Sequence, residues 1–350
     1  MKVTTIGIDL AKNVFQVHGV DEQGKTVIKK QLKRHQMAEF FVNMPTCLIG
    51  MEACSGAHYW ARKLTAMGHT VRLMAPQYVK PYVKSQKNDA ADAQAICEAV
   101  GRPSMRFVAI KNVDQQSVLA LHTARRGFVK ARTALGNQMR GLMGEFGVVI
   151  PKGLSSLVSR MPEELEDASN ELTAVVRLLL QQLLEHFKEI DTQVKKLEKQ
   201  IRVWSRQDEQ ARRIEQIPGI GPITASAVVA SLGDVSLFED GRQVSAWLGL
   251  VPRQHSSGGK TVLLGITKRG DSYLRVLFIQ GARAAIQAAQ RSAEGPPAWL
   301  AKLLARKHPN VAAVALASRN ARTVWALLAH KRDYDPKHGL DKCISAALAA

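Results

Sequence analysis

Short apolar runs separated by turn residues open the chain and predict an N-terminal sheet. The runs are rich in valine and isoleucine, and Asp21-Glu22-Gln23-Gly24 between two of them is typical of a tight turn. The expected elements are strands at 3–10, 14–20, 25–32, 47–52 and 71–75, and helices from about Ser55 to Gly68 and from near Asn88. Three meandering strands followed by alternating strands and helices is the order of a ribonuclease-H-like α/β fold.

From about Val113 the apolar spacing becomes that of long helices. Leu121, Phe128, Leu135 and Leu142 recur every seven residues, and a second, heptad-like run has one stutter near Phe187. The members of that run are Leu172, Val176, Leu179, Leu183, Phe187, Ile190, Val194, Leu197, Ile201 and Trp204. Such a stripe must be buried, either against the helix at 113–147 in an antiparallel hairpin or against a partner subunit.

These patterns divide the chain into three expected regions. Residues 1–110 form the α/β domain, 111–210 a helical coiled-coil region, and 211–350 a mainly helical C-terminal domain. Proline, glycine and serine in Val149–Pro162 predict a linker. The last region is expected to end in a basic, alanine-rich tail, with seven lysines and arginines and no acid from Lys302 to Arg332.

The net charge of the chain indicates which class of molecule it binds. The chain has 49 lysines and arginines against 30 acids, a net charge of +19 and an isoelectric point near 10.0. DNA or RNA is the polyanion favoured by this surplus, since no apolar run approaches the roughly 18 residues that span a bilayer. Cys47, Cys54, Cys97 and Cys343 have no zinc-finger spacing, and with no signal-peptide pattern at the start we expect a cytoplasmic protein.

Four acids provide the candidate chemistry. Asp9 interrupts an apolar strand and Glu52 ends another, while Asp89 and Asp92 share one face of a helix start. A carboxylate in an apolar strand is costly unless it is paired or binds a metal. Carboxylate oxygens suit Mg²⁺ or Mn²⁺, so together the four predict a metal site that acts on nucleic acid. For Asp89 and Asp92 alone, a solvated helix start is the simpler interpretation.

Basic residues and one turn are candidate contacts to nucleic acid. Between residues 102 and 140 there are eight lysines and arginines and one acid, which fits a solvated face or a phosphate-binding face equally well. The candidates there are Arg125, Arg126, Lys130 and Arg132. Gly219 and Gly221, followed by Pro222, suggest a helix-hairpin-helix turn whose backbone would approach a phosphate. An ordinary tight turn between helices would use the same residues.

A Ser-Ser-Gly-Gly loop at 256–259 is the last candidate. Such loops are usually flexible surface loops, and a nucleophilic serine would need a base, a metal or a polarised phosphate nearby. The residues that could hold a phosphate are His255, Lys260, Lys268, Arg269 and Arg275. Spacing alone does not show that they converge.

Five motifs in a fixed order resemble one family. They are Ile8-Asp9-Leu10-Ala11-Lys12, Met51-Glu52-Ala53, Asn88-Asp89-Ala90-Ala91-Asp92-Ala93, Ile217-Pro218-Gly219-Ile220-Gly221 and Gly249-Leu250-Val251-Pro252 with Ser257-Gly258. Over essentially its whole length the chain resembles transposases of the insertion-sequence 110 family, and most of all their 1111 subgroup.

The resemblance implies a RuvC-like domain with a four-carboxylate (DEDD) metal site, a coiled-coil middle and a C-terminal domain with a nucleophilic serine. Carried over residue by residue, the metal ligands are Asp9, Glu52, Asp89 and Asp92. The nucleophile is Ser257, with Ser256 as the alternative.

The same resemblance implies a bacterial, nucleoid-associated recombinase that is guided by an RNA encoded in the element. That bridge-type RNA pairs with donor and target DNA, and half-sites from different protomers of a dimer or tetramer form a phosphoserine link. Two other functions stay open. One is a structure-selective nuclease that uses only the carboxylates, and the other is a nucleic-acid-binding protein without activity.

Overall fold

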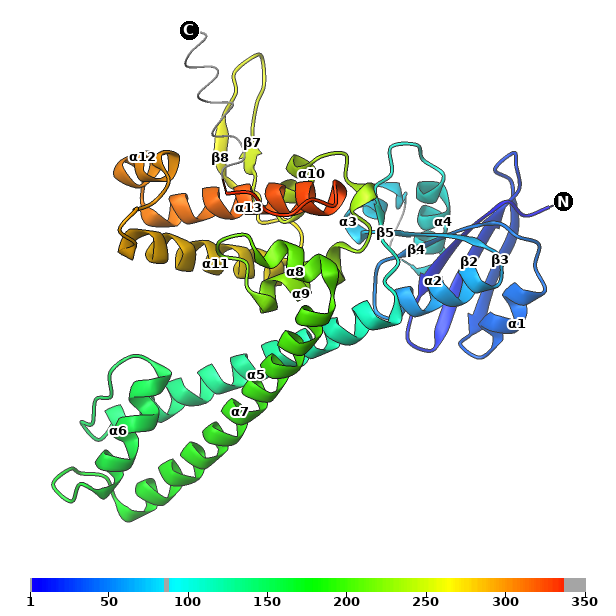
Figure 1. The fold of residues 1–350 in the computed structure, drawn as a ribbon. Helices are drawn as coiled ribbons and strands as arrows, with labels where there is room; N and C mark the ends of the chain where they lie inside the picture. The colour runs from blue at the N-terminus through cyan, green and yellow to red at the C-terminus, as the bar shows by residue number, and fades with distance from the viewer. Residues whose placement is uncertain (1, 85–87, 337–350) are drawn as a thin grey trace, which may run out of the picture. The chain divides into compact units, whose positions relative to one another are not determined.

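The chain divides into two compact units (Figure 1). The computed structural model describes residues 2–84 and 88–336, so Cys343 and the end of the expected C-terminal domain lie outside the described residues. The first unit contains Met1–Gln115 and Leu232–Glu239, and the second contains Gln116–Ser231 and Asp240–Ala350. The three expected regions stay a prediction beside this division.

A mixed six-stranded sheet forms the first unit. Its strands are β1 (Thr5–Leu10), β2 (Val14–Val20), β3 (Thr26–Lys33), β4 (Leu48–Glu52), β5 (Thr70–Met74) and β6 (Phe107–Val108). Their order in the sheet is β3-β2-β1-β4-β5-β6. β1 is antiparallel to β2 and parallel to β4, β5 is parallel to β4, and β6 closes the far edge in antiparallel pairing. The expected ribonuclease-H-like order is confirmed.

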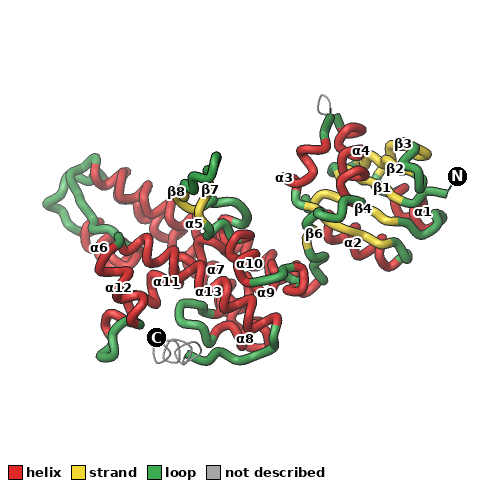
Figure 2. Tube along the Cα trace, turned by 90° about the horizontal axis from the view of Figure 1, so that it is seen from above, coloured by secondary structure: helices red, strands yellow, loops and turns green. Residues whose placement is uncertain are grey.

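Helices cover both faces of this sheet. They are α1 (Gln36–Val42), α2 (Ala57–Ala66), α3 (Pro76–Val79), the 3-10 turn η1 (Lys80–Tyr82) and α4 (Asp89–Val100). α2 packs on one face, where the Trp60 ring meets Phe15 edge to face at 5.5 Å, and α4 packs on the other (Figure 2). α1 and β6 were not predicted, because each is too short to show a clear period in the sequence.

Two long helices, α5 (Val113–Gly144) and α7 (Ala174–Gln207), form an antiparallel arm in the second unit. The ion pairs Arg125–Glu198 and Arg132–Asp191 join them. Between the two pairs α5 advances by seven residues while α7 goes back by seven, as expected of antiparallel helices. Of the two predicted ways to bury the heptad stripe, the structure uses the hairpin within the chain.

The predicted seam of α7 is wrong at Leu179, which is 41 % exposed. Leu172, Val176 and Leu183 pack in the core cluster as predicted, and Leu180 and Leu184 are buried beside them. From Phe187 onward the predicted positions Ile190, Val194 and Ile201 are buried. The cause is the stutter, which shifts the apolar stripe by one position near the tip of the arm, where a third helix packs against it.

That third helix replaces the predicted linker. α6 (Leu154–Glu166) buries Leu157 and Met161 completely in the cluster at the tip of the arm. Pro162 lies inside the helix. Proline, glycine and serine in this segment predicted a break in secondary structure. Burial of apolar side chains spaced one turn apart stabilises a helix there instead.

Short helices and one hairpin make up the rest of the second unit. They are α8 (Glu209–Glu215), α9 (Pro222–Leu232), α10 (Gly241–Trp247), β7 (Pro252–Gln254), β8 (Leu263–Ile266), α11 (Ser272–Arg291), α12 (Ala298–Arg306) and α13 (Pro309–Ala329). In the expected basic, alanine-rich tail, α12 and α13 are packed helices, and Ala312, Ala313 and Ala317 of α13 are fully buried. A role of this tail in contacting phosphate stays a prediction. Within the described residues, no helix is both long enough and apolar enough to cross a membrane.

One short segment returns to the first unit after α9. Leu232–Glu239, with the 3-10 turn η2 (Val235–Leu237), groups by its contacts with Met1–Gln115. Gly233 has φ +67°, and a Cβ atom there would lie 2.7 Å from the Cβ of Ala109. The first unit is therefore built from two stretches of sequence that lie far apart.

Candidate carboxylate site and serine hairpin

Asp9 and Glu52 lie side by side at the carboxyl ends of two parallel strands. The register pairs Ile8 of β1 with Met51 of β4, which places the next residue of each strand at neighbouring positions. Burial raises the pKa of the Cys54 thiol, and the negative charges of Glu52 and Asp9 raise it further. Both carboxylates are therefore close enough to act on the same side chain.

Two glycines bring helix α4 onto the face that carries these acids. A Cβ on Gly7 would lie 2.2 Å from the Ala93 carbonyl oxygen, and one on Gly50 would lie 2.7 Å from the Cβ of Val100. Side chains alternate along a strand, so Asp9 and Glu52, each two residues beyond a glycine, share the α4 face. The carboxylates therefore lie between the sheet and this helix layer.

The direction of α4 brings its first turn toward Asp9. Cys97 Sγ donates to the Thr5 carbonyl at 3.6 Å, near the start of β1, while Ala93 lies over Gly7. Asp92 directly precedes Ala93 and Asp89 lies one turn before it, so both approach the end of β1. The Asn88 side chain accepts from the Ala91 amide at 2.8 Å and caps the helix, as predicted.

The topology thus gathers all four acids at one end of one sheet face. Their carboxylate oxygens have the donor chemistry of a hard divalent ion. As the side chains stand, no three His, Cys, Asp or Glu residues in 2–84 and 88–336 are grouped so that they could hold a metal ion. Asp9, Glu52 and Asp92 are partly buried and Asp89 is exposed. The assignment of all four as ligands stays a prediction.

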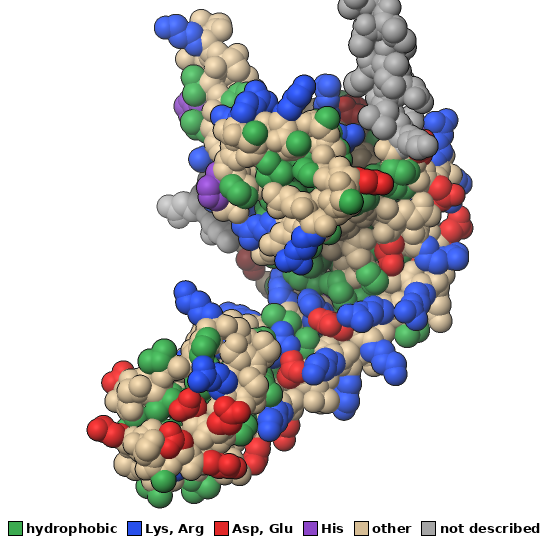
Figure 3. All heavy atoms as spheres, turned by 60° about the vertical axis from the view of Figure 1, so that its left-hand side comes forward, with side chains coloured by type: hydrophobic (Ala, Val, Ile, Leu, Met, Phe, Trp, Pro, Cys, Tyr) green, Lys and Arg blue, Asp and Glu red, His purple; other side chains and the backbone are tan. Residues whose placement is uncertain are grey.

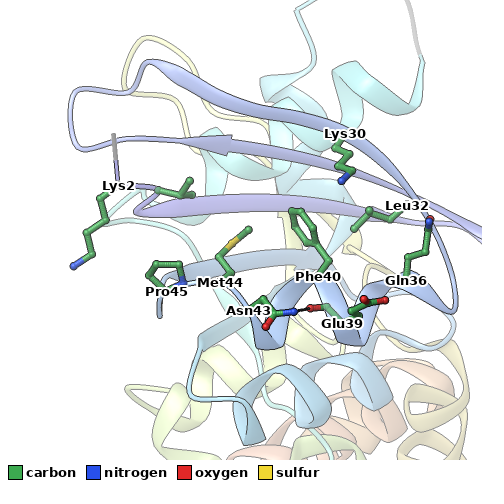
Figure 4. Close-up of a pocket in the computed structure, with 10 residues that line it drawn as sticks. Lys2, Lys30, Leu32, Gln36, Glu39, Phe40, Asn43, Met44 and Pro45 are labelled. Atoms are coloured by element: carbon green, nitrogen blue, oxygen red, sulfur yellow. Dashed lines mark hydrogen bonds between the residues drawn. The ribbon is translucent and has the colours of Figure 1, made fainter.

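An open hollow of about 570 Å³ lies elsewhere on the first unit (Figure 4). β3 and α1 line it, together with Lys2 before β1 and Pro45 before β4. Lys30 Nζ lies 5.2 Å from the centre of the Phe40 ring there. Leu32 in its lining pairs with Phe15, whose ring faces α2, so the hollow is on the opposite face of the sheet from Asp9 and Glu52.

Ser257 lies at the tip of an exposed hairpin in the second unit. β7 and β8 pair antiparallel, and the Lys260 amide donates to the Ser257 carbonyl at 3.0 Å. Between them, Gly258 and Gly259 have φ +54° and +77°, the conformation of a type I′ turn that glycine adopts without strain. The Ser256 hydroxyl oxygen accepts from Gln254 Nε2 at 2.9 Å. The predicted loop is thus a defined hairpin that presents Ser257 to solvent.

The base of this hairpin is held by Arg275. Its Nη1 atom donates to the carbonyls of Leu248 at 3.1 Å and Arg269 at 2.8 Å. A Cβ on Gly249 would lie 2.2 Å from the same Arg269 carbonyl oxygen, so the strands close tightly here. Arg275, predicted to contact phosphate, has a structural role in this arrangement. His255, Lys260, Lys268 and Arg269 are exposed along the hairpin.

The predicted helix-hairpin-helix turn joins α8 to α9, but its two glycines differ. Gly219 has φ +92°, and a Cβ there would lie 2.6 Å from the Gly281 carbonyl oxygen of α11. Asn320 Nδ2 also donates to the Pro218 carbonyl at 2.9 Å. Gly219 is therefore needed for packing within the protein, whereas Gly221 is exposed, with open space where a side chain would be.

The four basic residues of α5 that were predicted to contact nucleic acid have different surroundings. Arg125 and Arg132 form the ion pairs with α7, and the Arg126 guanidinium lies 5.6 Å from the Tyr273 ring centre. Lys130 is exposed. Figure 3 shows lysines and arginines interspersed with acids along the arm, so this surface is mixed in charge rather than uniformly basic.

A buried polar cluster in the second unit had no signal in the sequence. His122 Nε2 lies 3.0 Å from Ser226 Oγ, and its Nδ1 lies 2.9 Å from the Tyr273 hydroxyl. The Ser226 hydroxyl donates to the Pro222 carbonyl at 2.6 Å, so it accepts from the imidazole. Burial, helped by Arg125, lowers the pKa of His122 to about 4. The cluster ties α5, α9 and α11 together.

Known proteins match this chain along nearly its full length. Residues 6–147 match a family model described as Transposase, of the DEDD type in IS110 elements, and residues 211–295 match the Transposase IS116/IS110/IS902 family. A probable family 20 transposase of Pseudomonas aeruginosa is 50 % identical over 96 % of this chain and all of its own length. The transposase for insertion sequence element IS1111A of Coxiella burnetii is 43 % identical over 95 % of this chain and 91 % of its own.

A more distant relative is a pilin gene-inverting protein of Moraxella bovis, 24 % identical over 74 % of this chain and 75 % of its own. The six-stranded sheet with its acids at one end is the fold expected of a DEDD domain, and this domain implies dependence on a divalent metal. With relatives matching it from end to end, the chain belongs to the IS110/IS116/IS902 family of transposases, enzymes that cleave and join DNA.

Proposed function

We propose that this transposase cuts and rejoins donor and target DNA through a covalent phosphoserine link at Ser257. The observation that supports it best is the hairpin tip, where a type I′ turn presents this serine to solvent on a structured support. A nucleophile at the end of a projecting hairpin can reach a phosphodiester inside a DNA backbone. The gene-inverting relative is consistent with a reaction that rearranges DNA.

In the proposed step, Ser257 Oγ attacks a backbone phosphorus. The Oγ–P bond forms while one P–O bond of the strand breaks, and the hydroxyl proton leaves the serine as the displaced strand end takes one up. Attack by a new strand end on the phosphoserine reverses the exchange and restores the serine. The energy of the broken phosphodiester is kept in the link, so joining needs no further cofactor.

Asp9, Glu52, Asp89 and Asp92 are proposed to hold Mg²⁺ or Mn²⁺. Bound there, the ion would polarise the scissile phosphate and stabilise the oxygens that attack and leave. The chain contributes the fixed end of two parallel strands, where the backbone of β1 and β4 sets the spacing of Asp9 and Glu52. Asp89 and Asp92 lie in the first turn of α4, where a side chain can change rotamer without disturbing the sheet.

Guidance by an RNA encoded in the element and assembly into a dimer or tetramer complete the proposal. Both rest on the family resemblance, and the net charge of +19 suits a protein that carries RNA and DNA together. The serine hairpin belongs to the second unit and the acids to the first. An assembly could therefore combine these two parts from different protomers.

A denaturing gel tests the chemistry. Purified protein with its co-purified RNA is incubated with labelled donor and target DNA and Mg²⁺, beside Ser257→Ala, Ser256→Ala and Asp9→Asn. We expect a protein–DNA adduct that survives denaturation and requires both Ser257 and Asp9. Ser256→Ala is the matched control, since it removes a hydroxyl one residue away. Nuclease digestion of the RNA before the assay should abolish the adduct.

Two results would contradict the proposal. Cleavage without an adduct, at the same rate in Ser257→Ala, would identify a nuclease that uses only the carboxylates. Binding without any metal-dependent product would identify a nucleic-acid-binding protein that has lost its activity.

A further inference from the structure

Aromatic rings and cations cluster on the α2 face of the first unit. Tyr59, Trp60 and Lys63 come from α2, Phe15 from β2, and Arg34 from the end of β3. The Arg34 guanidinium lies 5.6 Å from the Trp60 ring centre and 5.9 Å from that of Phe15. Lys63 Nζ lies 5.7 Å from the ring centres of both Tyr59 and Trp60. We name these five residues the aromatic–basic cluster.

The cations of this cluster contact aromatic rings rather than acids. Among the described residues, no carboxylate lies within 4 Å of the charged groups of Arg34 or Lys63, in contrast to Arg102, which pairs with Glu98. Tyr59 is 44 % exposed, and the buried Trp60 indole N–H has no acceptor within the described chain. The Trp60 N–H is enclosed, so the cluster offers a ligand positive charge beside the partly exposed Tyr59 ring, which suits an anion that carries a flat ring.

Its place in the sheet relates it to the carboxylates. The Arg34 amide donates to the Asn13 carbonyl at 2.9 Å and Arg34 Nη1 donates to the Lys12 carbonyl at 3.3 Å. Lys12 and Asn13 form the turn after Asp9, so the cluster lies at the same end of the sheet as the acids. It faces α2, whereas the acids face α4, on the other side of the sheet.

We propose that the aromatic–basic cluster binds an unpaired nucleic-acid strand next to the carboxylate site. One base stacks on Tyr59, and the neighbouring phosphates lie against Arg34 and Lys63. A strand held this way can pass around the end of β1 and bring its next phosphodiester toward Asp9. Stacking requires a base that has left its duplex, so the site selects single strands, DNA or RNA, over intact duplex. The inference deepens the proposed function and rests on it for the role of Asp9.

Equilibrium binding of the full-length protein tests the proposal without depending on cleavage. The probes are labelled 20-nucleotide single strands of DNA and of RNA and a blunt DNA duplex, each titrated over a range of salt without Mg²⁺. Tyr59→Ala should weaken single-strand binding about tenfold and leave duplex binding unchanged, because one stacked base is lost. Tyr59→Phe keeps the ring and should restore affinity. The strand, DNA or RNA, that shows the larger loss is the one that occupies the cluster.

The double variant Arg34→Gln with Lys63→Gln tests the phosphate contacts. The slope of log K against log salt should become shallower by about 1.4, or roughly 0.7 for each lost phosphate contact. Lys2→Gln with Lys25→Gln is the matched control, because it removes the same charge at the opposite end of the same sheet.

Equal slopes for the two double variants would overturn the phosphate contacts. Equal losses for Tyr59→Ala and Tyr59→Phe, or an equal loss with duplex, would overturn the stacking site. If these binding results hold while no phosphoserine adduct forms, the proposed chemistry fails and the cluster stands as a binding site.

Discussion

Gly7 of β1 and Ala93 of α4 approach through their backbones alone, since a Cβ on Gly7 would lie 2.2 Å from the Ala93 carbonyl oxygen. The same helix carries Asp89 and Asp92 in its first turn. The position of two expected metal ligands thus depends on a residue that has no side chain.

Gly7→Ala should therefore destabilise the protein and reduce cleavage together. The added methyl group meets backbone, which cannot rotate away, so α4 must move, at a cost of at least about 2 kcal/mol. Denaturant unfolding measures the stability and the gel assay measures the cleavage. The control is Gly101→Ala at the other end of α4, where a Cβ would meet nothing within 4 Å. Equal stability of the two variants would show that the close approach is not required.

Asp9→Asn and Glu52→Gln should each lower strand cleavage at least about 100-fold while leaving DNA affinity within about twofold. Each removes a negative charge and keeps the shape of the side chain, so the loss reports on the carboxylate itself. Cleavage rates and binding isotherms on the same preparation separate the two effects. Glu22→Gln, in the exposed turn between β2 and β3, is the control. Cleavage close to the wild-type rate in either variant would remove that residue from the site.

Much of the first unit could be predicted from sequence, because strand identity there depends on local patterns. Asp9 stood out since it interrupts an apolar strand, and Asn88 since its side chain suits a helix start. The neighbouring position of Asp9 and Glu52 then follows from parallel pairing of β1 with β4. That pairing is the only non-local step in placing these two acids.

What could not be predicted depends on long-range packing. Gly219 looked like a phosphate-binding glycine, but it touches Gly281, sixty-two residues later in the sequence. Arg132 was predicted as a candidate contact to nucleic acid, because only the fold brings Asp191 next to it. Residues whose partners are distant in sequence leave no periodic signal, so spacing alone assigned them to solvent or to nucleic acid.

Arg132 and Lys130 should now behave differently. Arg132→Gln breaks a partly buried ion pair with Asp191 and should cost about 0.5 to 1 kcal/mol of unfolding free energy, with little change in the salt dependence of DNA binding. Lys130→Gln on the exposed side should leave stability unchanged, and should reduce the salt slope if this face contacts phosphate. A double-mutant cycle with Asp191→Asn measures the pair. An Arg132→Gln variant with full stability and a reduced salt slope would reverse the two assignments.

Stability should fall as the pH is lowered from 7 to 5. His122 has a pKa of about 4 in the folded protein because it is buried, against 6.5 in the unfolded chain, so the unfolded state binds the proton first. The stabilisation is present above pH 6.5 and is lost as the pH falls toward 4, by about 2 kcal/mol at pH 5. His122→Gln should flatten this part of the curve. The exposed His186→Gln is the control, and an unchanged pH dependence in His122→Gln would show that another group is responsible.

The return of Leu232–Glu239 to the first unit has a consequence for synthesis of the protein on the ribosome. The sheet is translated by Gln115, but the segment that packs beside Ala109 is made only after another 116 residues. At a synthesis rate of about 5–20 residues per second, the first unit stays incomplete for roughly 6 to 23 s after Gln115 has been added. A nascent chain that stops before Glu239 therefore carries the acids on an incomplete domain, and this domain is completed shortly before the serine hairpin begins at Pro252.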